Sequence, residues 1–70
     1  MAQKSVFGNA QALFASRSDI YVNVKGKWYF SNGPMATSIL AVAADARRAG
    51  IPVLLSYEDS NDSIYYIQSL

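Results

Sequence analysis

Apolar residues between positions 35 and 46 recur with the spacing of one face of an α-helix. Side chains three and four residues apart lie above one another on a helix, so such a run marks a buried stripe. The stripe consists of Met35, Ile39, Val42, Ala43 and Ala46. Because Pro34 precedes the run and proline suits a first helical position, the pattern predicts a helix over residues 34–49.

The residues on either side of this helix predict how it begins and ends. Ser31 and Asn32 are candidates for capping its first turn. Gly50 suits the left-handed cap that follows a last helical turn. Asp45 and Arg48 are three residues apart and can form an ion pair on the exposed face.

Two runs of β-branched and aromatic residues flank Lys25 and Gly26. The runs are residues 19–24 and 27–30, and a two-residue connection with glycine is typical of a hairpin. In the first run the apolar side chains alternate, which predicts one buried face and one exposed face. The alternating residues are Ile20, Val22 and Val24.

Two more strands are predicted after the helix, over residues 53–58 and 63–68. Asp59 to Asp62 separates them and has the composition of a turn. Pro52 lacks an amide donor, so its strand must start there or lie at a sheet edge. In the last strand, Ile64 and Tyr66 should face opposite to Tyr65 and Ile67. Large side chains on both faces favour burial by the helix on one side and by a second subunit on the other.

Residues 5–16 fit two patterns. Val6, Ala10, Leu13 and Phe14 follow helical spacing, whereas Ala10, Ala12 and Phe14 alternate as in a strand. A strand is favoured because the following segments would be its sheet partners, but periodicity alone leaves the helix open.

These elements predict one small α+β domain over residues 1–70. We expect a strongly curved, mainly antiparallel sheet or OB-fold-like barrel of about five strands, with one helix packed across it. A chain of this size buries only about 60% of its unfolded surface. Since 51% of the residues are hydrophobic and none is cysteine, we expect a homo-oligomer. The predicted interface residues are Trp28, Tyr57, Tyr65, Tyr66 and Ile67.

The charge balance gives no indication of nucleic-acid binding. The net charge is only +1, whereas nucleic-acid-binding domains usually carry a strongly basic patch. No apolar run is long enough to cross a membrane, so no membrane insertion is expected. The first residues do not resemble a signal peptide, and the absence of cysteine leaves the compartment open.

The chain lacks histidine and cysteine, which removes the common nucleophilic dyads and most transition-metal sites. Glu58, Asp59 and Asp62 match no calcium-loop spacing and are expected to solvate a turn. We therefore expect no enzymatic activity, metal or cofactor.

Two surfaces are candidates for binding. The first combines hydroxyls, a guanidinium and an aromatic ring, groups suited to a sugar or a carboxylate; it consists of Ser16, Arg17, Ser18, Asp19 and Tyr21. The same segment can also be an ordinary connection between strands. The second is a cation–aromatic cluster at the hairpin tip, formed by Lys25, Lys27 and Trp28.

The second half of the chain resembles the B subunits of the subtilase cytotoxin and typhoid toxin kind. The matching segments are Ala49-Gly-Ile-Pro-Val53 after the helix and Ser56-Tyr-Glu58 in the next strand. Upstream, Ile20-Tyr-Val-Asn-Val-Lys-Gly26 is similar to that family's aromatic strand before its hairpin. The chain departs from the family by having no disulfide and a shorter length.

The resemblance implies an OB-like fold, a ring of five copies, and recognition of glycans, often sialylated, near Ser16 or Ser18. A toxin-like protein would be secreted. The alternative is a small phage- or microbe-encoded cytoplasmic protein that sequesters a protein or a nucleotide. For an anionic ligand, its binding residues would be Arg17, Lys25, Lys27, Arg47 and Arg48.

Overall fold

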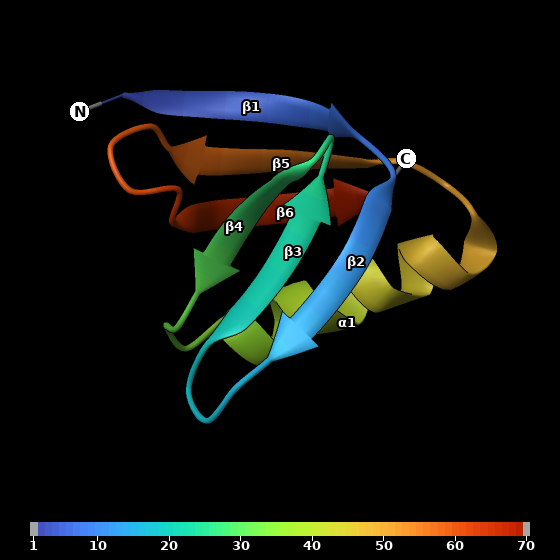
Figure 1. Ribbon diagram of the computed structural model, residues 1–70, viewed down its shortest axis with the longest axis horizontal. Coiled ribbons are helices and arrows are strands. Elements are labelled where there is room, and N and C mark those ends of the chain that lie inside the picture. The colour runs from blue at the N-terminus through green and yellow to red at the C-terminus, as the bar shows by residue number, and fades with distance from the viewer. Residues whose placement is uncertain (1, 70) are drawn as a thin grey trace.

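Two antiparallel sheets of three strands each surround an apolar interior in the computed structural model, which describes residues 2–69 (Figure 1). One sheet has the strand order β1-β5-β6 and the other has the order β2-β3-β4. The elements are β1 (Gln3–Gly8), β2 (Ala10–Ala15), β3 (Ile20–Val24), β4 (Lys27–Ser31), α1 (Ala36–Ala49), β5 (Val53–Glu58) and β6 (Ile64–Ser69). The predicted α+β class is confirmed, with six strands in place of about five.

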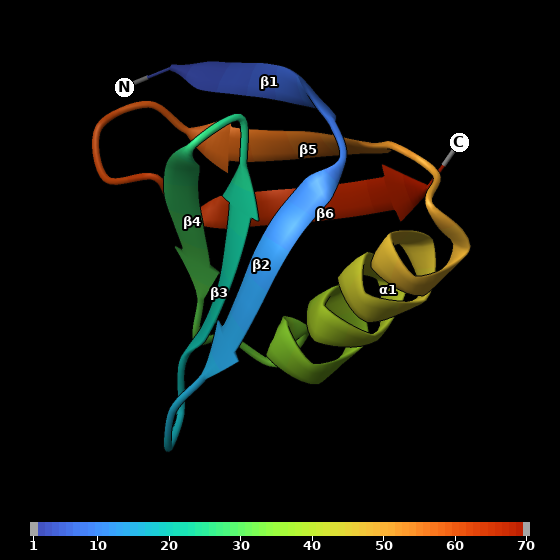
Figure 2. The same ribbon diagram turned by 45° about the vertical axis from the view of Figure 1, so that its right-hand side comes forward.

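Two junctions join the sheets into a partly open barrel (Figure 2). β1 continues into β2 through Asn9 alone, so one stretch of backbone pairs first with β5 and then with β3. On the opposite side, the amide of Phe30 donates to the carbonyl of Asp62 at 3.1 Å, and Phe30 forms a parallel bridge with Ser63. With β1 and β2 counted as one bent strand, this is a five-stranded OB-type barrel.

The bend at Asn9 explains why residues 5–16 fitted no single period. This segment was expected to form one strand, yet it forms parts of two strands in different sheets. The register of β2 against β3 also shifts between Ala10 and Ala12, which reverses the alternation of side chains at a bulge.

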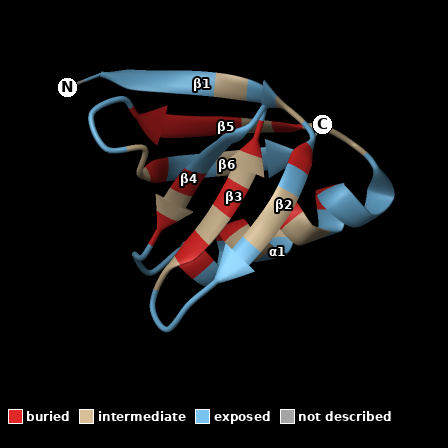
Figure 3. Cartoon of the chain, in the orientation of Figure 1, coloured by how far each residue is buried: buried red, intermediate tan, exposed pale blue. Residues whose placement is uncertain are grey.

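The interior is filled by alternate residues of both sheets and by the inner face of α1. Val22, Val24, Val53 and Leu55 are fully buried. In β3 burial alternates along the strand as predicted (Figure 3). α1 packs against β2, β3 and β6 and buries Ala36, Ile39, Ala43 and Ala46. Met35, expected on this face, is exposed because it precedes the first helical turn.

α1 ends as predicted but begins later. Gly50 has φ 73°, its amide donates to Arg47, and the amide of Ile51 donates to Ala46; this is the Schellman arrangement. The predicted polar cap is wrong: Met35 occupies the N-cap without a side-chain hydrogen bond. Ser31 is the last residue of β4 and is buried, so its hydroxyl is not placed at the helix.

The hairpin prediction is confirmed. β3 and β4 pair antiparallel around Lys25 and Gly26, whose φ values are 54° and 80°. Positive φ at both central residues is the type I′ geometry that matches the twist of the flanking strands.

Of the two alternatives given for Pro52, the first holds: β5 starts at Val53, directly after it, and is the central strand of its sheet and not an edge. The alternation predicted for the last strand is wrong. In β6, Ile64 is buried whereas Tyr65 and Tyr66 are both exposed. The pairing shifts between Ser56 and Tyr57, and this irregularity breaks the expected alternation.

The C-terminal cap of α1 gives a matched pair of substitutions. Gly50→Ala should lower the free energy of unfolding by about 1–2 kcal/mol, because a Cβ is disfavoured at positive φ. Gly33→Ala should be neutral or slightly stabilising, since that residue does not have positive φ and an added Cβ would meet no atom within 4 Å. Urea unfolding of both variants measures the difference. Equal stability of the two variants would contradict the assigned strain.

Candidate functional site

Aromatic side chains gather on the outward face of the β2-β3-β4 sheet. Phe14 pairs in register with Tyr21, and Tyr21 pairs with Phe30. Side chains alternate between the faces of a strand, so Tyr21 points opposite to the buried Ile20 and Val22. We call Phe14, Tyr21, Trp28 and Phe30 the aromatic face.

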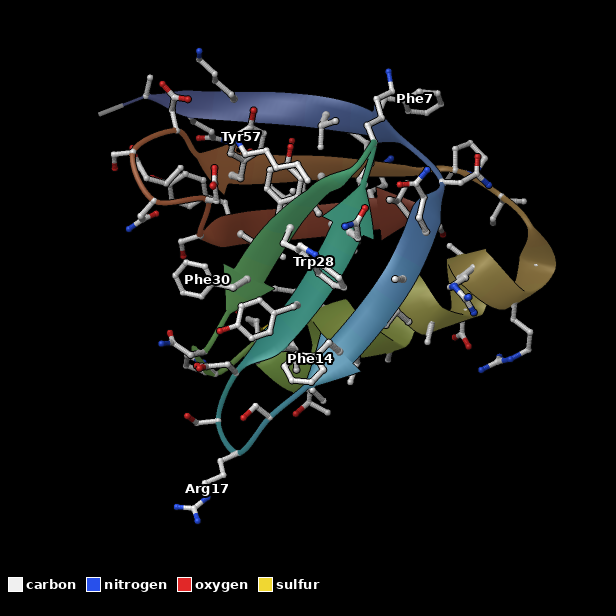
Figure 4. The ribbon with its side chains drawn as sticks, viewed as in Figure 1. Phe7, Phe14, Arg17, Trp28, Phe30 and Tyr57 are labelled. Carbon is white, nitrogen blue, oxygen red and sulfur yellow. The ribbon has the colours of Figure 1, made fainter. Side chains whose placement is uncertain are left out.

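Three of these rings form a ladder across the strands. The ring centroids of Phe14 and Tyr21 are 5.5 Å apart, and those of Tyr21 and Phe30 are 6.3 Å apart. Successive rings are inclined by 41° and 39°, following the twist of the sheet. Figure 4 shows Phe14, Trp28 and Phe30 on the same side of this sheet. Phe14 and Trp28 expose 55% and 45% of their surface, so their rings are available to a ligand.

An open hollow of about 530 Å³ lies on this face. It is lined by Leu13, Phe14, Ser16, Tyr21 and Trp28. An apolar wall with a few polar groups at its margin is typical of small-molecule sites. Asn23 lies opposite Trp28 in the register, and within residues 2–69 its buried Oδ1 accepts no hydrogen bond.

The structure brings together only part of the first predicted site. Ser16 and Tyr21 both line the hollow. Arg17 extends from the tip of the loop between β2 and β3, away from the barrel (Figure 4). Ser18 is exposed and Asp19 is half-buried, and neither lines the hollow. The loop is closed by the backbone, since the Ser16 amide donates to the Asp19 carbonyl at 2.8 Å.

The predicted interface residues lie in three different places. Trp28 belongs to the aromatic face. Tyr57 is 9% exposed, and its ring centroid is 4.6 Å from that of Tyr29, so its assignment to an interface is wrong: it is needed in the core. Tyr65 and Tyr66 are 52% and 45% exposed and stay predicted interface residues. Ile67, half-buried against the core, also stays a prediction.

Lys27 does not form the predicted cluster with Trp28. Its Nζ lies 3.1 Å from Asp62 Oδ1 and 5.5 Å from the ring centroids of both Tyr29 and Tyr57. Neighbouring residues of β4 face opposite ways, which separates Lys27 from Trp28. The hydrogen bond to Asp62 raises the pKa of Lys27. This contact ties the β3–β4 hairpin to the β5–β6 turn.

Glu58 is a buried carboxylate at the end of β5. Its oxygens accept hydrogen bonds from the Tyr65 hydroxyl at 2.5 Å, the Ser60 hydroxyl at 3.1 Å and the Ala2 amide at 3.2 Å. The bond from Tyr65, followed by those from Ser60 and Ala2, lowers the pKa of Glu58. The other two carboxylates of the turn are paired, Asp59 with Lys4 at 3.5 Å and Asp62 with Lys27. Two of the three carboxylates are therefore paired with lysines of β1 and β4, and Glu58 is held by neutral donors.

Two smaller hollows adjoin the start of α1. One, of about 120 Å³, lies between α1 and β6 and includes Val42, Tyr66 and Ile67 in its lining. The other, of about 240 Å³, lies beside residues 31–35. Met35, Ile39 and Tyr65 line both, which makes this an apolar groove along the open side of the barrel.

Sequence reasoning missed Leu13, Phe14 and Phe30 as site residues. The signal that could have found Phe30 was its two-residue spacing from Trp28, which places both rings on one face. Phe14 was missed because the Gly8-Asn9 pair, which signals a strand boundary, was read as part of one element over residues 5–16.

Glu58 predicts a pH dependence of stability. Its folded-state pKa lies below the ordinary value of 4.5, so the carboxylate stabilises the fold above pH 4.5. This contribution is lost as the pH falls through the lowered pKa. Tyr65→Phe removes the main hydrogen bond to Glu58, so its urea midpoint should decrease less than that of the parent protein as the pH falls below 4.5. Tyr66→Phe should show the same decrease as the parent protein. An acid profile of Tyr65→Phe identical to that of the parent protein would contradict this role.

Comparisons with other proteins do not add to the geometry. No protein-family model, curated protein or solved structure matches the chain, and the resemblance to toxin B subunits stays a prediction. Within residues 2–69 there is no group of three or more acidic, histidine or cysteine side chains able to hold a metal ion. The one helix described there is too short to span a membrane.

Proposed function

We propose that this protein is a non-enzymatic, self-associating module that binds a glycan on its aromatic face. The observation that carries the proposal is the open hollow of about 530 Å³, walled by Phe14, Tyr21 and Trp28. OB-type barrels bind oligosaccharides and oligonucleotides on the equivalent strands and on the loop that precedes them.

The chemistry of the hollow suits a sugar. A pyranose has an apolar C–H face that can lie on an aromatic ring, and hydroxyls at its edges that need hydrogen-bond partners. The rings of Phe14 and Trp28 provide the first contact, while the hydroxyls of Ser16 and Tyr21 are available for the second. Arg17 in the adjoining loop suits an acidic substituent on the sugar.

Self-association is supported by the groove between α1 and β6. Met35, Tyr65 and Tyr66 are 61%, 52% and 45% exposed, and all three line the hollow between α1 and β6. Neighbouring large apolar side chains that stay exposed mark an interaction surface. The toxin resemblance makes a ring of five copies the assembly to test first.

Removal of the Trp28 ring tests the binding site. Trp28→Ala should reduce binding to a glycan microarray at least tenfold while the urea midpoint changes little, because this side chain is 45% exposed. Phe7→Ala is the matched control, since Phe7 is a 47% exposed aromatic residue on the other sheet. Failure of the parent protein to bind any arrayed glycan would refute the glycan proposal.

Native mass spectrometry tests the assembly. The parent protein should appear as a discrete oligomer, and Tyr66→Ala should shift the population toward monomer, because the tyrosine ring would lose its burial against the neighbouring copy. Phe7→Ala should leave the distribution unchanged. A parent protein that is monomeric at micromolar concentration would exclude self-association, leaving the sugar site to be judged by the array.

A further inference from the structure

We infer that the glycan lies as an extended chain across β2, β3 and β4, with one sugar unit on each ring of the ladder Phe14–Tyr21–Phe30. The inference rests on the proposed glycan function. It adds that the ligand has at least three sugar units and that it runs across the strands from β2 to β4. It excludes recognition of one terminal sugar alone.

The spacing of the rings supports a chain. Adjacent strands lie about 4.8 Å apart, and register pairing places one ring on each of three adjacent strands. The resulting centroid separations of 5.5 and 6.3 Å are comparable to the advance of one pyranose along an extended polysaccharide. A single-unit ligand held between Phe14 and Trp28 in the hollow would leave the ring of Phe30 unused.

Polar groups stand at both ends of the ladder. Ser16 lies at the Phe14 end, where both residues line the hollow. At the other end Phe30 is bonded to the β5–β6 turn through the Asp62 carbonyl, and it bridges to Ser63. These two turns correspond to the loops that flank the ligand face in OB-type barrels. A chain along the ladder therefore starts at the Ser16 hydroxyl, makes apolar contact with the three rings, and ends beside the backbone of the β5–β6 turn.

Charge favours a glycan over a single nucleic-acid strand on the same rings. Single-strand binding combines stacking with a basic groove that follows the phosphates. No ladder residue is basic, Lys27 is paired with Asp62, and Arg17, the basic residue of the adjoining loop, extends away from the barrel. A protein with a net charge of +1 would displace few counterions from a nucleic-acid strand on binding, and it would gain little affinity from their release.

A length series tests the inference by isothermal titration calorimetry. The probes are chains of one to four units of β-1,4-linked glucose, β-1,4-linked N-acetylglucosamine and α-1,4-linked glucose, with an oligothymidylate as the nucleic-acid probe. In at least one series affinity should rise roughly threefold to tenfold with each unit up to the third, as one more aromatic contact forms. The fourth unit should add little.

Variants assign the third unit to its ring. Phe30→Leu removes the ring but keeps apolar volume, so it should abolish the advantage of three units over two and leave two-unit binding unchanged. Phe14→Leu should weaken the shorter probes as well. Phe7→Leu is the control, and urea unfolding of each variant verifies that the fold is retained.

Three results would overturn the inference. They are equal affinity for one and three units, absence of binding to all three series, and tighter binding of the oligothymidylate than of any sugar chain. If the microarray detects terminal sugars while the length series shows no gain, the extended chain is wrong and the glycan function stands. If neither method detects a sugar, both fail.

Discussion

The barrel depends on one strand that serves two sheets. Residues 3–15 pair with β5 and then, after the bend at Asn9, with β3. Because this one stretch belongs to both sheets, a 70-residue chain can enclose its interior. Phe30 and Asp62 hold the opposite side through one backbone hydrogen bond. The inward side chains of β3 and β5 therefore lie in the core, and Tyr57 is one of them. From the sequence alone, Tyr57 could equally be assigned to an interface.

The same commitment leaves the outward rings free. Val22 and Val24 are fully buried and fill the interior beneath β3, so Tyr21 contributes little to it and can face solvent. Phe14 and Trp28 are about half exposed, although exposing large aromatic rings is unfavourable in water. The aromatic face thus keeps large rings exposed to solvent, while Leu13 joins the hollow to the core beneath it.

Sequence reasoning was reliable wherever a local rule decided the structure. Gly50 and the Lys25-Gly26 turn were predicted because positive φ restricts the residue types allowed. It failed at the bend at Asn9, because Gly8 and Asn9 are residue types that signal a bend but were read as part of one strand. It also failed at the irregular pairing opposite Ser56, which is set by how β6 meets β5. Of the residues that line the hollow, the sequence predicted Ser16 and Tyr21 as binding residues and Trp28 as an interface residue. Its remaining residues depend on a strand register that periodicity does not specify.

Trp28 is the only tryptophan in the chain, and it lies in the wall of the hollow. The intrinsic fluorescence of the protein therefore reports on this one place. The indole is 45% exposed in the free protein, so it is only partly in contact with water there. Occupation of the hollow would exclude water from the ring and shift the emission to shorter wavelength. The fold has thus placed an optical probe at its candidate site, one that needs no label and can be excited apart from the five tyrosines.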